Sequence, residues 1–336
     1  MCLQSCPDFV SAAGPDQLTD IGGSVLFTDL TNEAFTSFVG FNNVARVGGS
    51  TTFEGLSKVV SFDGFNAVTR VGDAVEVKSL RAMTDFKGFE KLERIDGEGS
   101  TSPTTNDLYF YYTQKAANFH GSFGELDYVG GGIYFSNAMV DGGITSGKLF
   151  PKLREVLGGF KAHDRYGNAV GSAGVHFPAL EIVGETLHLE TLYANGLQVE
   201  MAGAFPKLKQ CKNIQLNSIT FYATGNASVF GALEEVEEIE FSTVRTSGCN
   251  PAPSACHIDL AEWFPVLKTV TKQLRIGQSP AITGFGFKSL ESVGKFAITG
   301  NPKLAICRSE YDQLVNSVTK SSATGQIVPG TFIESC

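Results

Sequence analysis

This chain of 336 residues is poor in several features that would point to a familiar class of protein. It has one Trp and four Met. It also lacks any run of about 20 apolar residues, so we expect no segment that spans a bilayer. Positive charge is in deficit, because 26 Lys and Arg face 35 Asp and Glu, a net charge of −9. That balance argues against nucleic acid or an anionic membrane as the main partner.

Motifs that carry chemistry are missing as well. None of the five histidines takes part in the H-x-x-x-H spacing of a metal site. The glycine-rich stretch YVGGGIYF (128–135) lacks the spacing of a phosphate-binding loop. We therefore expect neither a cofactor nor a metal ion.

Glycine and phenylalanine, in contrast, are abundant, with 38 and 26 copies, and they belong to a repeat. The stretches GFNNVARVG (40–48), GFNAVTRVG (64–72) and GFEKLERID (88–96) share one pattern. An aromatic residue is followed three positions later by Leu or Val, and three positions further by another apolar residue. Eleven copies follow one another at intervals of 23–28 residues, apart from two intervals of 34. Their first residues are Pro15, Phe41, Phe65, Phe89, Phe123, Phe150, Phe177, Phe205, Phe230, Phe264 and Phe287.

Period-two alternation follows the repeat, for example in VEV (75–77), IYF (133–135) and LHL (187–189). Such alternation indicates a short, half-buried strand. One coil of this length cannot bury its apolar side alone, but stacked coils can, with strands paired in parallel from one coil to the next. We predict a mainly β chain: a right-handed parallel β-helix, or leucine-rich-repeat-like solenoid, of about eleven coils.

The solenoid is predicted to be a single domain, 1–336, with a cap at each end. Residues 1–14 would form the N-terminal cap, 15–306 the coils and 307–336 the C-terminal cap. A short helix is expected at 308–320, where apolar residues recur at helical spacing.

Six of the seven cysteines fall into local pairs in polar surroundings, which is typical of disulfides in an oxidising compartment. The predicted disulfide-stapled caps and loop use Cys2 with Cys6, Cys249 with Cys256, and Cys307 with Cys336. Zinc is the alternative, although C-x3-C and C-x6-C bring no histidine at ligand spacing. The start of the chain is not a signal peptide, so export would require a leader that was removed or lies outside this numbering.

Two further positions follow from the pattern. Cys211 replaces the inward Val of its copy, so we expect a buried core thiol rather than a nucleophile. Asn226 opens an Asn-x-Ser triplet, a candidate glycosylation acceptor.

Alternation also predicts which residue at the centre of each strand points outward. In chain order these are Leu26, Thr52, Glu76, an aromatic of LYFYY (108–112), Tyr134, Lys161, His188, Gln215, Glu240, Arg275 and Ala297. Neighbouring coils would place such residues about 4.8 Å apart. We therefore predict a binding face that contains Tyr109, Phe110, Tyr111, Tyr134, Lys161 and His188. The alternative is that the insert at about 97–107 covers these rings.

Another outward position, just before the second apolar residue of each copy, holds Arg46, Arg70 and Arg94 in successive copies. Elsewhere the position varies, so these three residues are expected to form a local basic stripe.

The stretch GFKSLESVGKFAITGNPKLAICRSEYDQLV (286–315) resembles the receptor L domain, as does FPALEIVGETLHLETL (177–192). That family comprises β-helical, leucine-rich-like modules of insulin and epidermal growth factor receptor ectodomains and of many microbial surface proteins. The resemblance spans roughly 15–307 and is nearer to the microbial branch. It implies a recognition or structural surface.

We therefore expect a non-catalytic, extracellular or cell-surface solenoid that binds a protein or glycan partner or packs into a larger assembly. A β-helix enzyme would need carboxylates at equivalent positions of neighbouring coils. Glu76 and Glu240 are several coils apart. The alternative is a carbohydrate-active lyase or hydrolase whose carboxylate site is not recognisable from the sequence.

Overall fold

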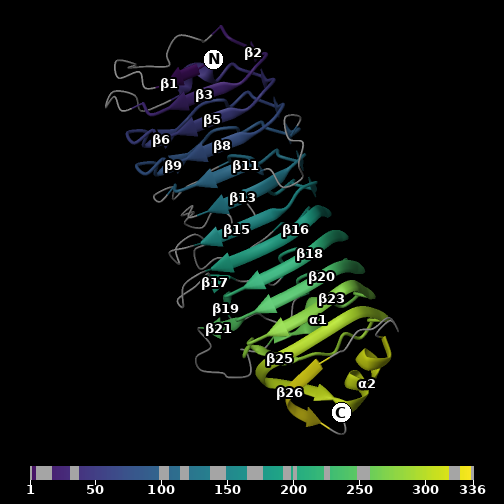
Figure 1. Ribbon diagram of the computed structural model, residues 1–336. Coiled ribbons are helices and arrows are strands. Elements are labelled where there is room, and N and C mark those ends of the chain that lie inside the picture. The colour runs from purple at the N-terminus through teal and green to yellow at the C-terminus, as the bar shows by residue number, and fades with distance from the viewer. Residues whose placement is uncertain are drawn as a thin grey trace. The chain divides into compact units, whose positions relative to one another are not determined.

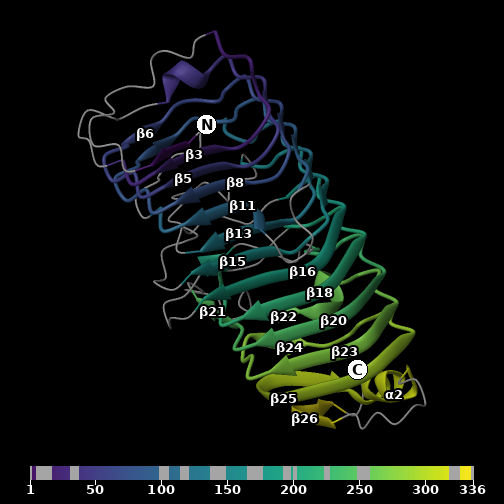
Figure 2. The same cartoon turned by 45° about the horizontal axis from the view of Figure 1, so that its top comes forward.

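The computed structural model describes residues 2–4, 17–30, 38–97, 106–113, 121–136, 149–164, 177–191, 198–199, 203–222, 228–247, 258–317 and 326–333. The chain divides into two compact units, Met1–Gly171 and Ser172–Cys336. In both units the strands are stacked in parallel rungs (Figures 1 and 2). The chain is therefore mainly β and forms a parallel β-solenoid, as predicted.

In the first unit, one face of the solenoid is a parallel sheet with one strand from each coil. Its strands, in order, are β1 (Cys2–Gln4), β3 (Val25–Thr28), β5 (Thr51–Glu54), β8 (Val75–Lys78), β11 (Asn106–Tyr111), β13 (Gly132–Ser136) and β15 (Phe160–Asp164). Two-residue strands pair in the same way at the corner before each strand from β3 to β15. They are β2 (Asp20–Ile21), β4 (Arg46–Val47), β7 (Arg70–Val71), β10 (Arg94–Ile95), β12 (Tyr128–Val129) and β14 (Glu155–Val156). The return path contains the 3₁₀ helix η1 (Val39–Phe41) and the paired strands β6 (Ser61–Phe62) and β9 (Asp85–Phe86).

In the second unit, the corner strand and the sheet strand are fused into one long strand. These strands are β16 (Ile182–Thr191), β18 (Gln210–Asn217), β20 (Glu235–Ser242), β23 (Thr269–Gly277) and β25 (Ser292–Cys307). Register shifts in the β16–β18, β20–β23 and β23–β25 pairings, such as that between Val236 and Glu238, mark β-bulges where the strands turn the corner. The shorter strands are β17 (Gln198–Val199), β19 (Thr220–Tyr222), β21 (Arg245–Ser247), β22 (Ile258–Asp259) and β24 (Ile282–Gly284).

Both α-helices found among the described residues lie in the second unit, and both are short. They are α1 (Leu260–Trp263) and α2 (Arg308–Ser317). α2 confirms the helix predicted near the C-terminus. The strand β26 (Gln326–Ile333), which pairs in parallel with β25, was not predicted.

The core of each unit is a ladder of stacked phenylalanines. The repeat anchors Phe41, Phe65, Phe89, Phe123 and Phe150 follow one another with ring centroids 5.0, 5.6, 5.9 and 5.9 Å apart. The anchors of the second unit stack at 5.5, 5.5, 4.8 and 5.9 Å from Phe177 to Phe287. All are buried, so the predicted inward role of the anchors is confirmed.

Three of these anchors have an unusual backbone that the repeat pattern did not reveal. Phe65, Phe89 and Phe123 have φ angles of 61°, 58° and 56°, in the left-handed region that bulky residues rarely adopt. The carbonyl of each of these anchors accepts a hydrogen bond from the amide three residues later, at 3.1–3.2 Å, as the carbonyl of Phe41 does without the left-handed backbone. Burial of the ring within the ladder offsets the cost of this backbone conformation.

Four predictions about the organisation of the chain differ from the structure or concern residues outside its described part. The solenoid has about eight turns, so the predicted count of about eleven coils is not supported. No bonded pair of cysteines lies within the described part of the chain. Cys307 is disulfide-bonded, but its partner is not described, so the three pairs stay predictions. The predicted insert at 97–107, the loop that Cys249 and Cys256 would close, and the acceptor Asn226 lie wholly or largely outside the described residues.

The single-domain assignment stays a prediction, since each unit is described by itself. None of the helices in the described segments is long and apolar enough to cross a membrane.

Candidate functional site

The outward column predicted for the first unit is present in the strand register. Leu26, Thr52, Glu76, Tyr109, Tyr134 and Lys161 lie opposite one another on successive strands from β3 to β15. A second outward column runs two residues further along the same strands. It contains Thr28, Glu54, Lys78, Tyr111, Ser136 and His163.

Tyrosines are central to both columns. The rings of Tyr109 and Tyr134 are parallel within 7°, with centroids 5.2 Å apart. Tyr111 stacks on Tyr109 at 6.0 Å and is one of the exposed large side chains, at 36%. We call these three residues, together with Lys78 and Lys161, the tyrosine surface.

Phe110 does not belong to this surface, and its prediction as a binding residue is wrong. Its side chain is fully buried. The ring stacks on Phe135 at 5.2 Å and meets Phe123 edge-on at 5.9 Å. Successive residues of a strand face opposite sides of the sheet, so Phe110 must point inward when Tyr109 and Tyr111 point outward.

Two lysines close the tyrosine stack at its ends. Lys78 Nζ, on the strand before Tyr109, lies 5.5 Å from the centroid of that ring. Lys161 Nζ, on the strand after Tyr134, lies 5.4 Å from the centroid of Tyr134. Lys78 also pairs with Glu76 at 2.9 Å, and Glu76 accepts a hydrogen bond from the Thr52 hydroxyl at 3.0 Å. Sequence reasoning missed Lys78; the second outward position of the alternation would have found it.

This stacking leaves the edges and hydroxyl groups of Tyr109 and Tyr134 for contact, because the faces of these two rings lie against each other and against the lysines. Burial, assisted by Tyr134, Tyr111 and nearby carboxylates, raises the pKa of Tyr109 from 10.0 to about 12. The phenol is therefore a neutral hydrogen-bond donor at any physiological pH. Sugar rings generally use open aromatic faces, so the geometry suits a protein partner better than a glycan.

The sixth predicted residue, His188, lies on β16 in the second unit. It begins a column of outward residues that continues through Gln215, Glu240, Arg275 and Ala297, as predicted. Its Nε2 atom lies 3.4 Å from both Glu190 Oε2 and Asn217 Nδ2. The predicted set therefore splits into the tyrosine surface of one unit and a polar group in the other.

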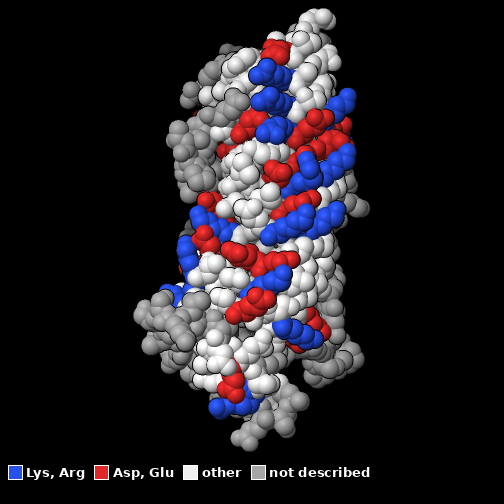
Figure 3. Space-filling model, turned by 90° about the vertical axis from the view of Figure 1, so that its right-hand side faces the viewer, with Lys and Arg blue, Asp and Glu red and all other residues white. Residues whose placement is uncertain are grey.

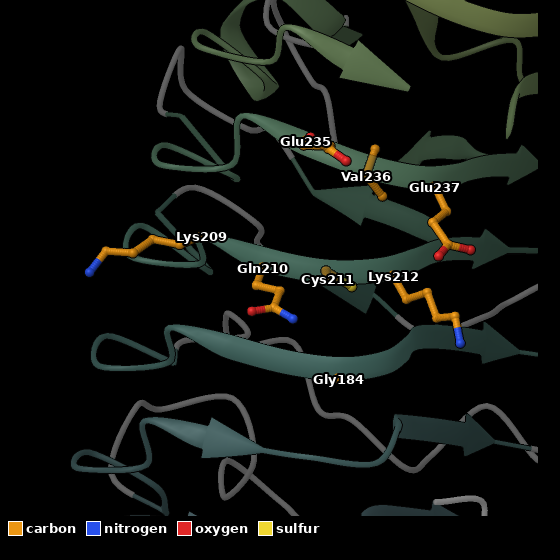
Figure 4. A pocket seen from close by; sticks show the side chains of 8 residues that line it. All are labelled: Gly184, Lys209, Gln210, Cys211, Lys212, Glu235, Val236 and Glu237. Atoms are coloured by element: carbon orange, nitrogen blue, oxygen red, sulfur yellow. The ribbon is translucent and has the colours of Figure 1, made fainter. Parts of the chain in front are cut away.

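A hollow of about 570 Å³ lies at the bulged corner of the second unit (Figure 4). It is lined by Gly184, Lys209, Gln210, Cys211, Lys212, Glu235, Val236 and Glu237. Lysines at its two ends point away from each other, and Cys211 lies between them.

The thiol and the lysines that line this hollow show little chemical reactivity. The Cys211 thiol is 3% exposed and lies 3.1 Å from the carbonyl oxygen of Asn213. Burial raises its pKa to about 12, so it is a neutral core thiol, as predicted, rather than a nucleophile. Lys209 pairs with Glu181 at 2.7 Å and Lys212 with Glu185 at 3.0 Å, which leaves neither cation dedicated to a ligand.

Comparison with known proteins does not identify a family for this chain. No protein-family model, curated protein or solved structure matches this chain. The candidate site therefore rests on the geometry of the described residues.

Asp127 is a carboxylate at the corner of the first unit whose pKa is shifted. Asp127 and Glu93 occupy neighbouring coils at the corner of the first unit. Hydrogen bonding and charge from Arg154 lower the pKa of the Asp127 carboxyl, the opposite of what a general acid requires. Within the described ranges, no group of three or more His, Cys, Asp or Glu is placed to hold a metal ion.

Proposed function

We propose that this protein is a non-catalytic recognition solenoid that binds a protein partner through the tyrosine surface of its first unit. The observation that carries the proposal is the outward stack of Tyr109 and Tyr134 between two lysines. Tyrosines held in a rigid stack lose little conformational entropy on binding, and they are enriched at protein interfaces. The sheet beneath them is rigid because each strand is paired on both sides.

The setting we propose is extracellular or at the cell surface, with the leader removed, and the protein is of the receptor L-domain type in its microbial branch. The supporting features are the repeat in 286–315, the parallel coils and the local cysteine pairs. The predicted disulfides at Cys2–Cys6, Cys249–Cys256 and Cys307–Cys336 would stabilise the caps and one loop in that compartment. Packing into a larger assembly would use the same surface.

Site-specific photo-crosslinking in the native host tests the binding proposal. A photoreactive residue at position 111 should crosslink to one protein, and the yield should fall when Tyr134→Ser is added. Lys207, an exposed residue of the second unit, provides the control position. Equal crosslinking from 111 and 207, or no dependence on Tyr134, would contradict the proposal.

The enzyme alternative has its own test. The full chain is incubated with neutral and acidic polysaccharides, and new reducing ends and unsaturated uronate absorbance are measured. The proposal expects neither signal above that of a heat-denatured sample.

A further inference from the structure

Three arginines form a continuous stripe along the corner of the first unit. Arg46 lies opposite Arg70, and Arg70 lies opposite Arg94, on the paired strands β4, β7 and β10. All three side chains are exposed, and neighbouring coils set them about 4.8 Å apart. Lys and Arg side chains stacked above one another are visible on the upper part of the face in Figure 3. The predicted basic stripe is therefore present.

A single carboxylate holds two of the three guanidinium groups in place. The carboxylate of Asp96, whose side chain is only 5% exposed, accepts hydrogen bonds from the Nε atoms of both Arg70 and Arg94. Arg94 Nε lies 2.6 Å from Asp96 Oδ1, and its guanidinium lies over the Tyr128 ring at 3.7 Å. A planar guanidinium fixed by a carboxylate and an aromatic ring is preordered to bind an oxyanion.

The charge balance of the stripe differs from that of other cations on the protein. Arg154 has Asp127 as its own partner, and Lys152 has Glu125. In the stripe, Arg70 and Arg94 share the carboxylate of Asp96, the charge of Arg94 also acts on Asp127, and Arg46 has no ion-pair partner among the residues that the structure describes.

Glycines lie beside the stripe, and exposed carboxylates lie at its borders. The corner glycines Gly48 and Gly72 follow closely on Arg46 and Arg70, so no side chain at those positions keeps a ligand from the backbone. Exposed carboxylates border the stripe, with Asp20 in register beyond Arg46 and Glu93 beside Arg94.

We infer that the stripe of Arg46, Arg70 and Arg94 is a binding site for an acidic polysaccharide that lies along the stack of coils, with its carboxylate or sulfate groups on successive arginines. An acidic peptide fits less well, because same-side residues of an extended chain repeat at about 6.6 Å and fall out of step with the coils. The site is independent of the tyrosine surface.

The experiment measures binding of the full chain to polygalacturonate, dextran sulfate, neutral dextran and poly-glutamate by biolayer interferometry at two salt concentrations. The two acidic polysaccharides separate carboxylate from sulfate as the preferred group, and binding should weaken as salt rises. Arg46→Gln should weaken binding by roughly fivefold, the value of one exposed charge contact. It removes no ion pair within the described residues, so folding should be unaffected.

Three further variants make the test specific. Lys207→Gln changes the net charge equally on the second unit and should leave binding unchanged. Arg94→Lys keeps the charge but loses the planar group on Tyr128, and it should weaken binding. Glu93→Gln removes a bordering carboxylate and should strengthen binding. Equal losses from Arg46→Gln and Lys207→Gln, or tighter binding of poly-glutamate than of either polysaccharide, would overturn the inference.

Discussion

A Cβ atom on Gly72 would overlap with the carbonyl oxygen of Gly48 in the preceding coil. The two corners can approach this closely because neither residue has a side chain. At the same corner the Gly72 amide donates a 2.9 Å hydrogen bond to the carbonyl of Val47.

Gly72→Ala is therefore expected to lower the free energy of unfolding by about 1–3 kcal/mol, as overpacking does in tight sites. Gly22→Ala is the matched control, because it occupies the equivalent corner with no atom within 4 Å of its added Cβ. Urea denaturation of both variants measures the difference, and equal stabilities would refute the close-packed corner.

The phenylalanine ladder should dominate the stability of its unit. Phe89 is fully buried and stacks on both Phe65 and Phe123. Phe89→Ala should cost about 3–5 kcal/mol, the range for large aromatic truncations in a core. Tyr111→Ala, on the exposed side, should cost less than about 1 kcal/mol. Chemical denaturation, followed by the circular dichroism of the backbone, provides the measurement.

The buried thiol of Cys211 is expected to make the folded state less stable at alkaline pH. Its pKa is about 12 in the folded chain against 9.0 ordinarily. The folded state therefore holds a proton between pH 9 and 12 that the unfolded state releases. The free energy of unfolding should fall over that window, by at most about 1.4 kcal/mol per pH unit from this group. Below pH 9 the contribution is fully present.

Cys211→Val, which restores the usual residue of the repeat, should reduce the alkaline slope. A thiol reagent at pH 8 should leave Cys211 unmodified until denaturant is added. Rapid labelling of the native protein at this position, read by peptide mass spectrometry, would argue against a buried thiol.

Charges of alternating sign run across the coils of the second unit. Lys209 pairs with Glu181 on one side, and Lys268 pairs with Glu234 in the same column further on. Lys209→Glu would place like charges on three successive coils and should destabilise the unit by roughly 0.5–1 kcal/mol at low salt. Added salt should reduce the loss, since exposed charges are screened. Lys207→Glu, with the same charge change outside the column, should have little effect.

Asn301 shows how a buried polar residue can be fully used. Its Oδ1 atom accepts the Ser279 amide at 2.9 Å, and its Nδ2 atom donates to the carbonyls of Ile276 and Thr299 at 3.0 and 3.1 Å. Asn301→Ala leaves these groups unpaired and should cost about 1–3 kcal/mol. Asn301→Asp keeps the acceptor alone and should fold with intermediate or lower stability, as thermal denaturation would show.

Much of the architecture was predictable because the relevant signals are local. The recurring aromatic residue and the alternation after it correctly predicted the anchors Phe41 to Phe287 and the outward column from Leu26 to Lys161. The helix near the C-terminus followed from its own periodicity. The same alternation, applied strictly, would have excluded Phe110 from the binding face.

Other features were not accessible in this way. The left-handed backbone of Phe65 is not visible in the repeat, since Phe177 and Phe205 fit the same template and stack without it. The fused strand β16 and its neighbours depend on bulges that show no composition signal. Asp96 accepts hydrogen bonds from Arg70, which lies 26 residues earlier in the chain, and from Arg94, which lies 2 residues earlier.

The sequence by itself determined which side chains of each coil face the core, because strand alternation has a period of two and the repeat has a constant template. Only the tertiary structure decided which outward side chains touch one another. Contacts such as Tyr109 on Tyr134, or Arg94 on Tyr128, depend on the register between coils separated by tens of residues. That register is set by backbone hydrogen bonds and core packing along the whole stack, which no short stretch of sequence encodes.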